Sequence, residues 1–171
     1  DSPEEICRYM NEYLPEDIAV LSVEEAAPRF HARLNAVRKT YVYRIWNAPV
    51  KNVFRRRFTT WIQKPLDLDA MEQAATLLCG THDYRAFCSL KKFKKSTVRT
   101  IEKIEIGKMG QEIRISYTGD GFLYHMVRIL TGTLVEVGLG LRKPEEMTEI
   151  LEGQDRTKAG RLMPPEGLTL E

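Results

Sequence analysis

The sequence is poor in the residues that build disulfide frameworks and metal centres. It has three cysteines, Cys7, Cys79 and Cys88, none in C-x-x-C spacing, and its three histidines form no ligand pattern. An odd number of cysteines without this spacing argues against both a disulfide framework and a zinc knuckle. We therefore expect a reduced chain, as is usual in the cytoplasm, with no bound metal.

Long uninterrupted apolar runs are also missing. Arg128 and Glu136 break the longest run before it reaches the ~18 residues of a membrane span, so we expect no membrane segment. We also expect no signal peptide, because no charged and apolar leader pattern opens the chain. Gly138-Leu-Gly140 follows a predicted helix instead of joining a strand to a helix, so no glycine-rich phosphate loop is predicted. With 43% hydrophobic and 29% charged residues, the composition is typical of one soluble globular domain.

Acidic residues are absent from one long stretch. The net charge is only +2, but residues 28–66 hold ten Lys or Arg and no Asp or Glu, whereas residues 1–27 hold eight acids and a single base. A second basic cluster spans residues 85–99. A block of like charge is usually a solvated face. Both blocks, however, are interleaved with Tyr, Trp and Phe, and cations with flat rings suit phosphates and unpaired bases. The pattern favours nucleic-acid binding over a merely solvated surface.

Arg128 is the most informative residue, because it lies within an otherwise apolar helical stretch, Gly121–Val137. A guanidinium does not lose its proton, and an unpaired one in a low-dielectric interior costs several kcal/mol or more, as an order of magnitude. Arg128 therefore requires an anionic partner. A structural ion pair in the core, an arginine that reaches water at the helix edge, and an active-site arginine all remain compatible with the pattern.

The periodicity predicts an α+β fold, with an antiparallel or mixed sheet packed against helices. Helices are expected at residues 3–14, 68–79, 121–137 and 144–152. Strands are expected at residues 18–23, 39–47, 98–107 and 112–118, with a strand or extended loop at 53–63 and a final strand after 163.

No Ser–His–Asp or Cys–His set has supporting sequence context. Several motifs in order do carry a resemblance. They are Phe30-His-Ala-Arg33, Lys39-x-Tyr41-x-Tyr43-x-Ile45, His82-Asp83-Tyr84-x-x-Phe87, Gly121-Phe-Leu-Tyr-His-Met-Val-Arg128, Gly132-x-Leu-Val-Glu-Val-Gly138 and Pro164-Pro165-x-Gly167-Leu168-x-Leu170. In order and spacing, from about Leu14 to the end, the chain closely resembles the TruA-type tRNA pseudouridine synthases.

The resemblance implies an isomerase that converts uridine to pseudouridine in the anticodon stem-loop of tRNA, at tRNA positions 38–40, without metal or cofactor. It implies that Tyr41 stacks on the target base and that Arg128 pairs with the catalytic aspartate. Taken without the resemblance, Tyr41 is better explained as a core aromatic of its strand. The resemblance also implies a homodimer with tRNA crossing both subunits, and we expect the protein to be cytoplasmic. For RNA contact we expect Arg38, Lys39, Arg55, Arg56, Arg57, Lys91, Lys92, Lys94 and Lys95.

The chain departs from the family in one respect: it has no Arg-Thr-Asp-Ala-Gly-Val-His-like motif, which carries the nucleophilic aspartate. Neither Asp17 nor Asp120 lies in a comparable context. We therefore expect residues 1–171 to represent the C-terminal half of the pseudouridine synthase fold, inactive alone, with Arg128 lacking its partner and a sheet edge left open to self-association. The alternative is a noncatalytic RNA-binding module. A general basic protein, such as a ribosomal one, would not explain an arginine buried in a helix.

Overall fold

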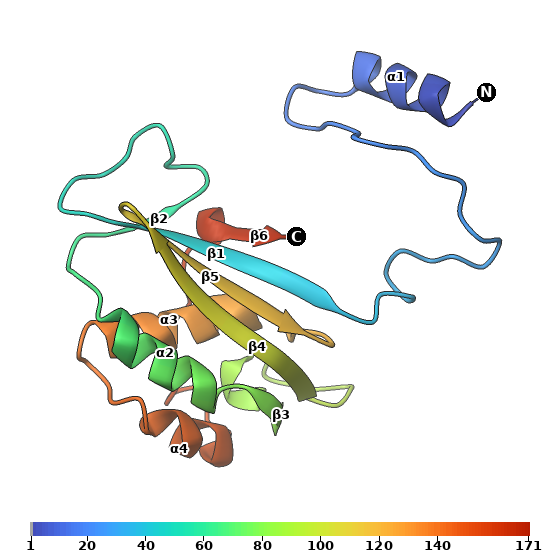
Figure 1. The fold of residues 1–171 in the computed structure, drawn as a ribbon. Coiled ribbons are helices and arrows are strands. Elements are labelled where there is room, and N and C mark those ends of the chain that lie inside the picture. Colours follow the sequence, from blue (N-terminus) through green and yellow to red (C-terminus); the bar gives the residue numbers. More distant parts are fainter. Residues whose placement is uncertain (1) are drawn as a thin grey trace. The chain divides into compact units, whose positions relative to one another are not determined.

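The computed structural model describes residues 2–171 and divides the chain into two units, Asp1–Ala36 and Val37–Glu171 (Figure 1). The first unit contains helix α1 (Pro3–Tyr13), which begins with a capping box. The Ser2 hydroxyl accepts a hydrogen bond from the Glu5 backbone N–H at 3.2 Å, and the Glu5 carboxylate accepts one from the Ser2 N–H at 2.8 Å. These two bonds satisfy amide donors that no helical turn can reach, which is why the helix starts here. The predicted helix at residues 3–14 is confirmed.

The predicted strand at residues 18–23 is wrong, because that segment has no regular secondary structure. The side chain of Asn11 takes the place of a neighbouring strand: its amide nitrogen donates to the Val20 carbonyl, and its oxygen accepts from the Val20 N–H, both at 2.8 Å. A strand requires a partner backbone. Val20 instead satisfies its backbone groups on the side chain of α1.

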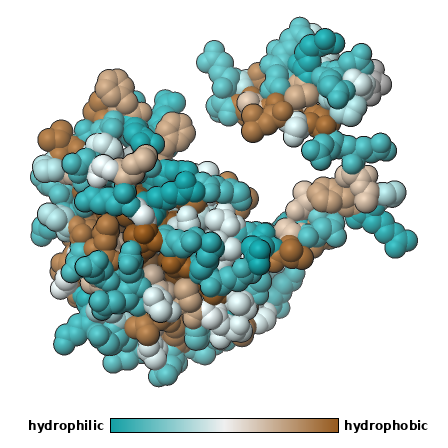
Figure 2. Space-filling model, viewed as in Figure 1, coloured by the Kyte–Doolittle hydropathy of each residue, from teal (hydrophilic) through white to brown (hydrophobic). Residues whose placement is uncertain are grey.

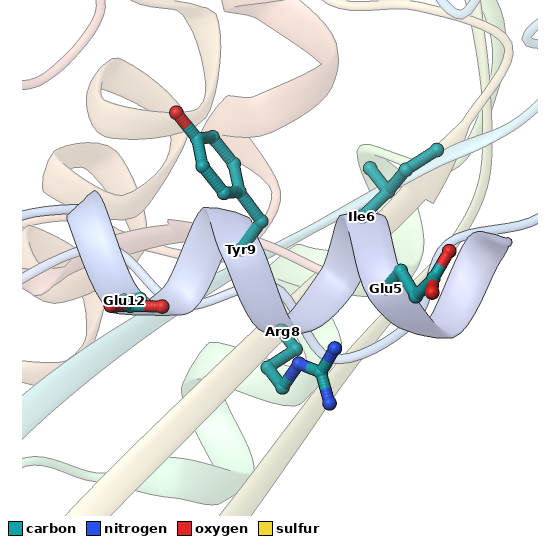
Figure 3. A pocket seen from close by; sticks show the side chains of 5 residues that line it. All are labelled: Glu5, Ile6, Arg8, Tyr9 and Glu12. Atoms are coloured by element: carbon teal, nitrogen blue, oxygen red, sulfur yellow. The ribbon is translucent and has the colours of Figure 1, made fainter. Parts of the chain in front are cut away.

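Helix α1 buries none of its residues within the described chain. Ile6 and Tyr9 project from one side of the helix and Arg8 from the other (Figure 3). Tyr13 is 68% exposed, and its ring lies 4.7 Å from that of Tyr9. The space-filling view shows apolar surface on this unit (Figure 2). Within its unit, α1 therefore depends on its cap and local hydrogen bonds, since it has no core of its own to pack against.

The second unit is built on a six-stranded mixed sheet with the order β2-β1-β5-β4-β3, and β6 also pairs with β1. The strands are β1 (Lys39–Asn47), β2 (Thr60–Ile62), β3 (Gly80–Asp83), β4 (Val98–Met109), β5 (Glu112–Gly119) and β6 (Leu168–Leu170). Only the β1–β2 pairing is parallel; all the others are antiparallel. The predicted α+β fold with a mixed sheet against helices is confirmed, although the predicted 53–63 segment contributes only the three residues of β2.

Helices α2 (Leu68–Leu77), α3 (Met126–Gly138) and α4 (Glu146–Gly153) lie on one side of this sheet (Figure 1). Alternate residues of the central strands face them, as the period of two requires. Tyr43 pairs with Ile115 and Ile45 with Ile113, and all four side chains are fully buried. Within residues 2–171, the structure contains no helix with the length and hydropathy of a membrane span.

The start of the long buried helix was predicted incorrectly. Helix α3 begins at Met126, five residues later than the apolar pattern suggested, because His125 has a φ of 64°. A left-handed residue cannot continue a right-handed helix. Residues 121–125 therefore form a turn, and the Leu123 carbonyl accepts a hydrogen bond from the Met126 N–H at 3.0 Å. This turn places Phe122 and Tyr124 outside the helix, where they can contact other elements.

Candidate active site

Tyr41 and Phe122 come together at one end of the sheet. Tyr41 lies on the helix-facing side of β1, opposite Tyr117 of β5, and is half-buried. The edge of one ring meets the face of the other at an interplanar angle of 89°, with the Tyr41 and Phe122 centroids 5.3 Å apart. Edge-to-face contact is a favoured geometry for aromatic pairs. The contact fixes the Tyr41 ring while leaving part of its surface accessible.

Arg128 lies in the first turn of α3 and is bound to the C-terminal segment. Its Nε donates a hydrogen bond to the Met163 carbonyl at 2.6 Å, and the Met163 N–H donates to the Arg128 carbonyl at 3.3 Å. Arg128 is half-buried, whereas Met163 is fully buried. A guanidinium has five N–H donors in a fixed planar fork. Because Nε is bound to the Met163 carbonyl, the guanidinium plane is held in one orientation. The direction of its two terminal nitrogens is therefore fixed as well.

Tyr43 also binds the C-terminal segment that contains Met163. Its hydroxyl donates to the Pro164 carbonyl at 2.7 Å and lies 2.6 Å from the Thr60 hydroxyl. Burial raises the pKa of Tyr43 to about 12, although the Thr60 hydrogen bond and the Arg128 charge act in the opposite direction. Tyr43 therefore remains a neutral donor near pH 7. A Cβ added at Gly167 would lie 2.8 Å from the Tyr43 ring, so only glycine allows this close approach.

No carboxylate within residues 2–171 forms an ion pair with Arg128. Asp120 is the nearest acid in the sequence to the Gly121–Arg128 motif, but its Oδ1 accepts from the Thr100 N–H at 3.0 Å at the end of the β4–β5 pair. Asp17 lies in the other unit. The described residues also bring together no group of three or more His, Cys, Asp or Glu that could hold a metal ion.

The basic residues that were expected to contact RNA differ in how they are held. Arg38 pairs with Glu102 at 2.8 Å and Arg55 pairs with Glu112, so these two charges are partly compensated. Lys39 opens β1 and is half-buried. The remaining six are exposed and form no ion pair within the described part of the chain: Arg56, Arg57, Lys91, Lys92, Lys94 and Lys95. Their role in RNA contact stays a prediction.

Sequence reasoning alone missed the supporting residues. Phe122, Tyr43 and the carbonyl of Met163 set the positions of Tyr41 and Arg128, but they lie far apart in the sequence. A signal did exist for Tyr43, because the spacing Tyr41-x-Tyr43 puts both rings on one face of a strand. Nothing in the local sequence distinguishes the Met163 carbonyl from any other.

Comparison with known proteins identifies related sequences. The family described as tRNA pseudouridine synthase matches residues 74–171. A tRNA pseudouridine synthase A from Brevibacillus brevis is 48% identical over 94% of this chain, and one from Clostridium tetani, tRNA pseudouridine synthase A 2, is 46% identical over 95%. A tRNA pseudouridine synthase A from Geobacillus kaustophilus is 42% identical over 99% of the chain.

The similarity spans this chain but not the whole of those relatives. The matched region covers 66% of the Brevibacillus brevis protein, 65% of the Clostridium tetani protein and 66% of the Geobacillus kaustophilus protein, just under two thirds of each. The family match alone covers more than half of the present chain, including β4, β5, α3 and β6. It includes Arg128 and Phe122, whereas Tyr41 falls within the longer pairwise similarities. The chain belongs to the tRNA pseudouridine synthase family.

Proposed function

We propose that this protein isomerises uridine to pseudouridine in the anticodon stem-loop of tRNA. In this reaction the N1–C1′ glycosidic bond of the target uridine breaks and a C5–C1′ bond forms. The C5 hydrogen leaves to water as a proton and N1 takes up a proton, so that the product is an isomer of uridine. The chemistry needs a carboxylate at the ribose, a ring that holds the base while it is detached, and a cation that orients the carboxylate. Arg128 carries the proposal: it is anchored through Nε and has no carboxylate partner in the described residues.

The role proposed for Arg128 follows from guanidinium geometry. A planar fork can bind a carboxylate through two parallel hydrogen bonds, which a point charge cannot reproduce. A nearby cation also favours the ionised form of a carboxylate. We propose that this carboxylate is supplied from outside these 171 residues, by a further segment or by a second chain. Tyr41, fixed edge-to-face by Phe122, would stack on the target base.

Tritium release from tRNA that carries C5-labelled uridine tests the proposal. We expect the whole encoded protein to release tritium and the 171-residue chain alone to release none. A transcript in which cytidine replaces every uridine at tRNA positions 38–40 is the control and should release no tritium. Release by the 171-residue chain would overturn the external carboxylate and would require Asp17 and Asp120 to be tested.

A noncatalytic RNA-binding module is the second candidate. It is favoured by the exposed cations of the basic blocks and by the lack, among residues 2–171, of a carboxylate paired with Arg128. The tritium-release assay also distinguishes the two candidate functions. Salt-dependent tRNA binding by the whole protein without any tritium release would support the module and contradict the isomerase. The homodimer expected from the family would be tested in parallel by sedimentation.

The exposed arginines of the β1–β2 connection give a further prediction. Replacing Arg56 and Arg57 together by Gln should weaken tRNA binding for every tRNA sequence, and should reduce the slope of log K against log salt by about 1 to 2. Arg55 is omitted because Glu112 compensates its charge. Lys143→Gln, on the connection between α3 and α4, is the matched control. An unchanged salt slope in the double variant would exclude both arginines from the RNA contact.

A further inference from the structure

A groove lies beside the Tyr41–Phe122 pair, between the lysine-rich loop and the turn before α3. It has a volume of about 410 Å³, within the range of small-ligand sites. One wall is formed by Phe122, Leu123 and Tyr124 of the turn, and the other by Leu90 and Phe93 of the loop. Phe122 therefore contacts Tyr41 and also lines this groove. The groove is adjacent to the proposed target-base position and distinct from it.

The charge of the groove is of one sign. Lys92, Lys94, Lys95 and Arg99 line it, and no acidic residue does so within the described part of the chain. Arg99 is held in place, since its Nη1 donates to the Ser96 carbonyl at 3.0 Å and to the Val98 carbonyl at 2.6 Å. Neither acceptor is a carboxylate, so the positive charge of Arg99 is not neutralised. Four cations around an aromatic slot complement an anion that carries a flat ring.

The aromatic walls are held by specific contacts. The rings of Tyr124 and His125 are stacked, with centroids 3.7 Å apart and an interplanar angle of 26°. Tyr124 is nevertheless 56% exposed, so ring surface remains for another partner. Arg85 lies over the Phe93 ring at 5.5 Å from its centroid, while Phe93 itself is half-buried. Each ring therefore has a neighbour that restrains it, His125 for Tyr124 and Arg85 for Phe93.

Two hydrogen bonds join the two walls. The Ser89 N–H donates to the Tyr124 carbonyl at 3.3 Å, and the Ser89 hydroxyl lies 3.1 Å from Nδ1 of His125. The Leu90 N–H also lies 3.5 Å from the sulfur of buried Cys88. His125, whose backbone is left-handed, thus lies against the loop through its ring. A site that is already assembled pays less conformational entropy on binding.

We propose that this groove binds one unpaired nucleotide of the RNA substrate, a neighbour of the target uridine, with the base stacked against Tyr124 and Phe93 and the phosphate held by Lys94, Lys95 and Arg99. The inference rests on the proposed function, because it assigns a second nucleotide position to the same RNA. Stacking accepts any base, since every base has a π face. The groove therefore selects an unpaired loop nucleotide over a base-paired one, whatever its sequence.

The test uses the whole encoded protein and anticodon stem-loop RNAs in which 2-aminopurine replaces one loop nucleotide at a time. We expect fluorescence quenching on binding at a loop position other than the target uridine. Tyr124→Ala should abolish this quenching and weaken binding by about 5- to 100-fold. Tyr124→Phe should retain both, because the ring and not the hydroxyl carries the contact. Quenching that persists in Tyr124→Ala, or occurs at no other loop position, would overturn the proposal.

Tritium release by the same proteins separates this proposal from the proposed function. If the wild-type protein releases tritium while Tyr124→Ala binds and quenches like wild type, the groove proposal fails and the isomerase stands. If the wild-type protein releases none but Tyr124→Ala still loses quenching and affinity, the groove stands and the isomerase fails. Lys94→Gln with Lys95→Gln should weaken binding and lower the salt slope, with Lys143→Gln again as the control.

Discussion

Replacing Arg128 by Lys in the whole encoded protein should lower the rate of tritium release by about 100-fold or more. The affinity for tRNA should change by no more than about threefold, because the net charge is conserved. The Lys ammonium can neither donate to the Met163 carbonyl in the same plane nor offer a bidentate fork to a carboxylate. The loss should appear in single-turnover rates at saturating enzyme, and binding should be measured separately on RNA without target uridines.

A matched control for Arg128→Lys is available in the same helical region. Arg142 pairs with Glu136 through Nε at 2.6 Å, and its side chain is 21% exposed. Arg142→Lys should leave tritium release within about twofold of wild type, because that ion pair lies outside the site described. If Arg128→Lys weakened tRNA binding as much as it slowed release, a purely structural arginine would be indicated. Urea unfolding of both variants would show whether a loss of stability explains either result.

Gly132→Ala is expected to be strongly destabilising, because Gly132 has the shortest added-Cβ contact of the described glycines. A Cβ at Gly132 would lie 1.9 Å from the Arg161 carbonyl oxygen and 2.9 Å from its carbon. Both are backbone atoms, so no rotamer change relieves the overlap. Overpacking costs about 1–3 kcal/mol and sometimes more, against a gain of about 1 kcal/mol from replacing Gly in a helix. Because the overlap is with backbone atoms, we expect the cost to lie at the upper end of this range, about 3 kcal/mol, and the net loss in the free energy of unfolding to be about 2 kcal/mol.

The control for this prediction is Gly107→Ala on β4, where an added Cβ would meet nothing within 4 Å. Its stability should stay within about 0.5 kcal/mol of wild type. Equilibrium urea unfolding gives the comparison, with a lower midpoint and an unchanged slope expected for Gly132→Ala. Wild-type stability of Gly132→Ala would contradict the close packing of residues 159–163 on α3. That packing also positions Met163 against Arg128, so activity should fall along with stability.

Residues 159–163 pack directly against α3, and the site depends on this close contact between backbones. The Gly160 N–H donates to the Thr133 hydroxyl at 2.9 Å, and a Cβ at Gly160 would lie 2.6 Å from the Thr133 backbone. Two glycines, one on each side, allow the segment to pass along the helix. Three residues after Gly160, Met163 offers its carbonyl to Arg128. Gly132 opens one of the motifs that resemble the family, but nothing in the local sequence shows that either glycine makes this backbone contact.

Local chemistry made part of the fold predictable. The capping box at Ser2 and Glu5, the alternating pattern of residues 112–118 and the Asp67 cap of α2 are determined by neighbours in the sequence. The sequence also singled out Arg128 as a guanidinium in an apolar stretch, although its anionic partner stays a prediction. These features depend on groups within a few residues of each other, and for that reason the sequence pattern predicts them.

Other features were decided only by the tertiary structure. Residues 18–23 have a strand-like composition but no strand partner, because Asn11 satisfies Val20. The apolar run at 121–137 carries no mark of the turn at His125, which places Phe122 on Tyr41 and Tyr124 beside the lysine-rich loop. The sequence by itself determined which residues carry charge, rings and caps, and so which family the chain resembles. Tertiary packing decided which of them meet, because backbone hydrogen bonds and ring contacts between distant segments have no local signature.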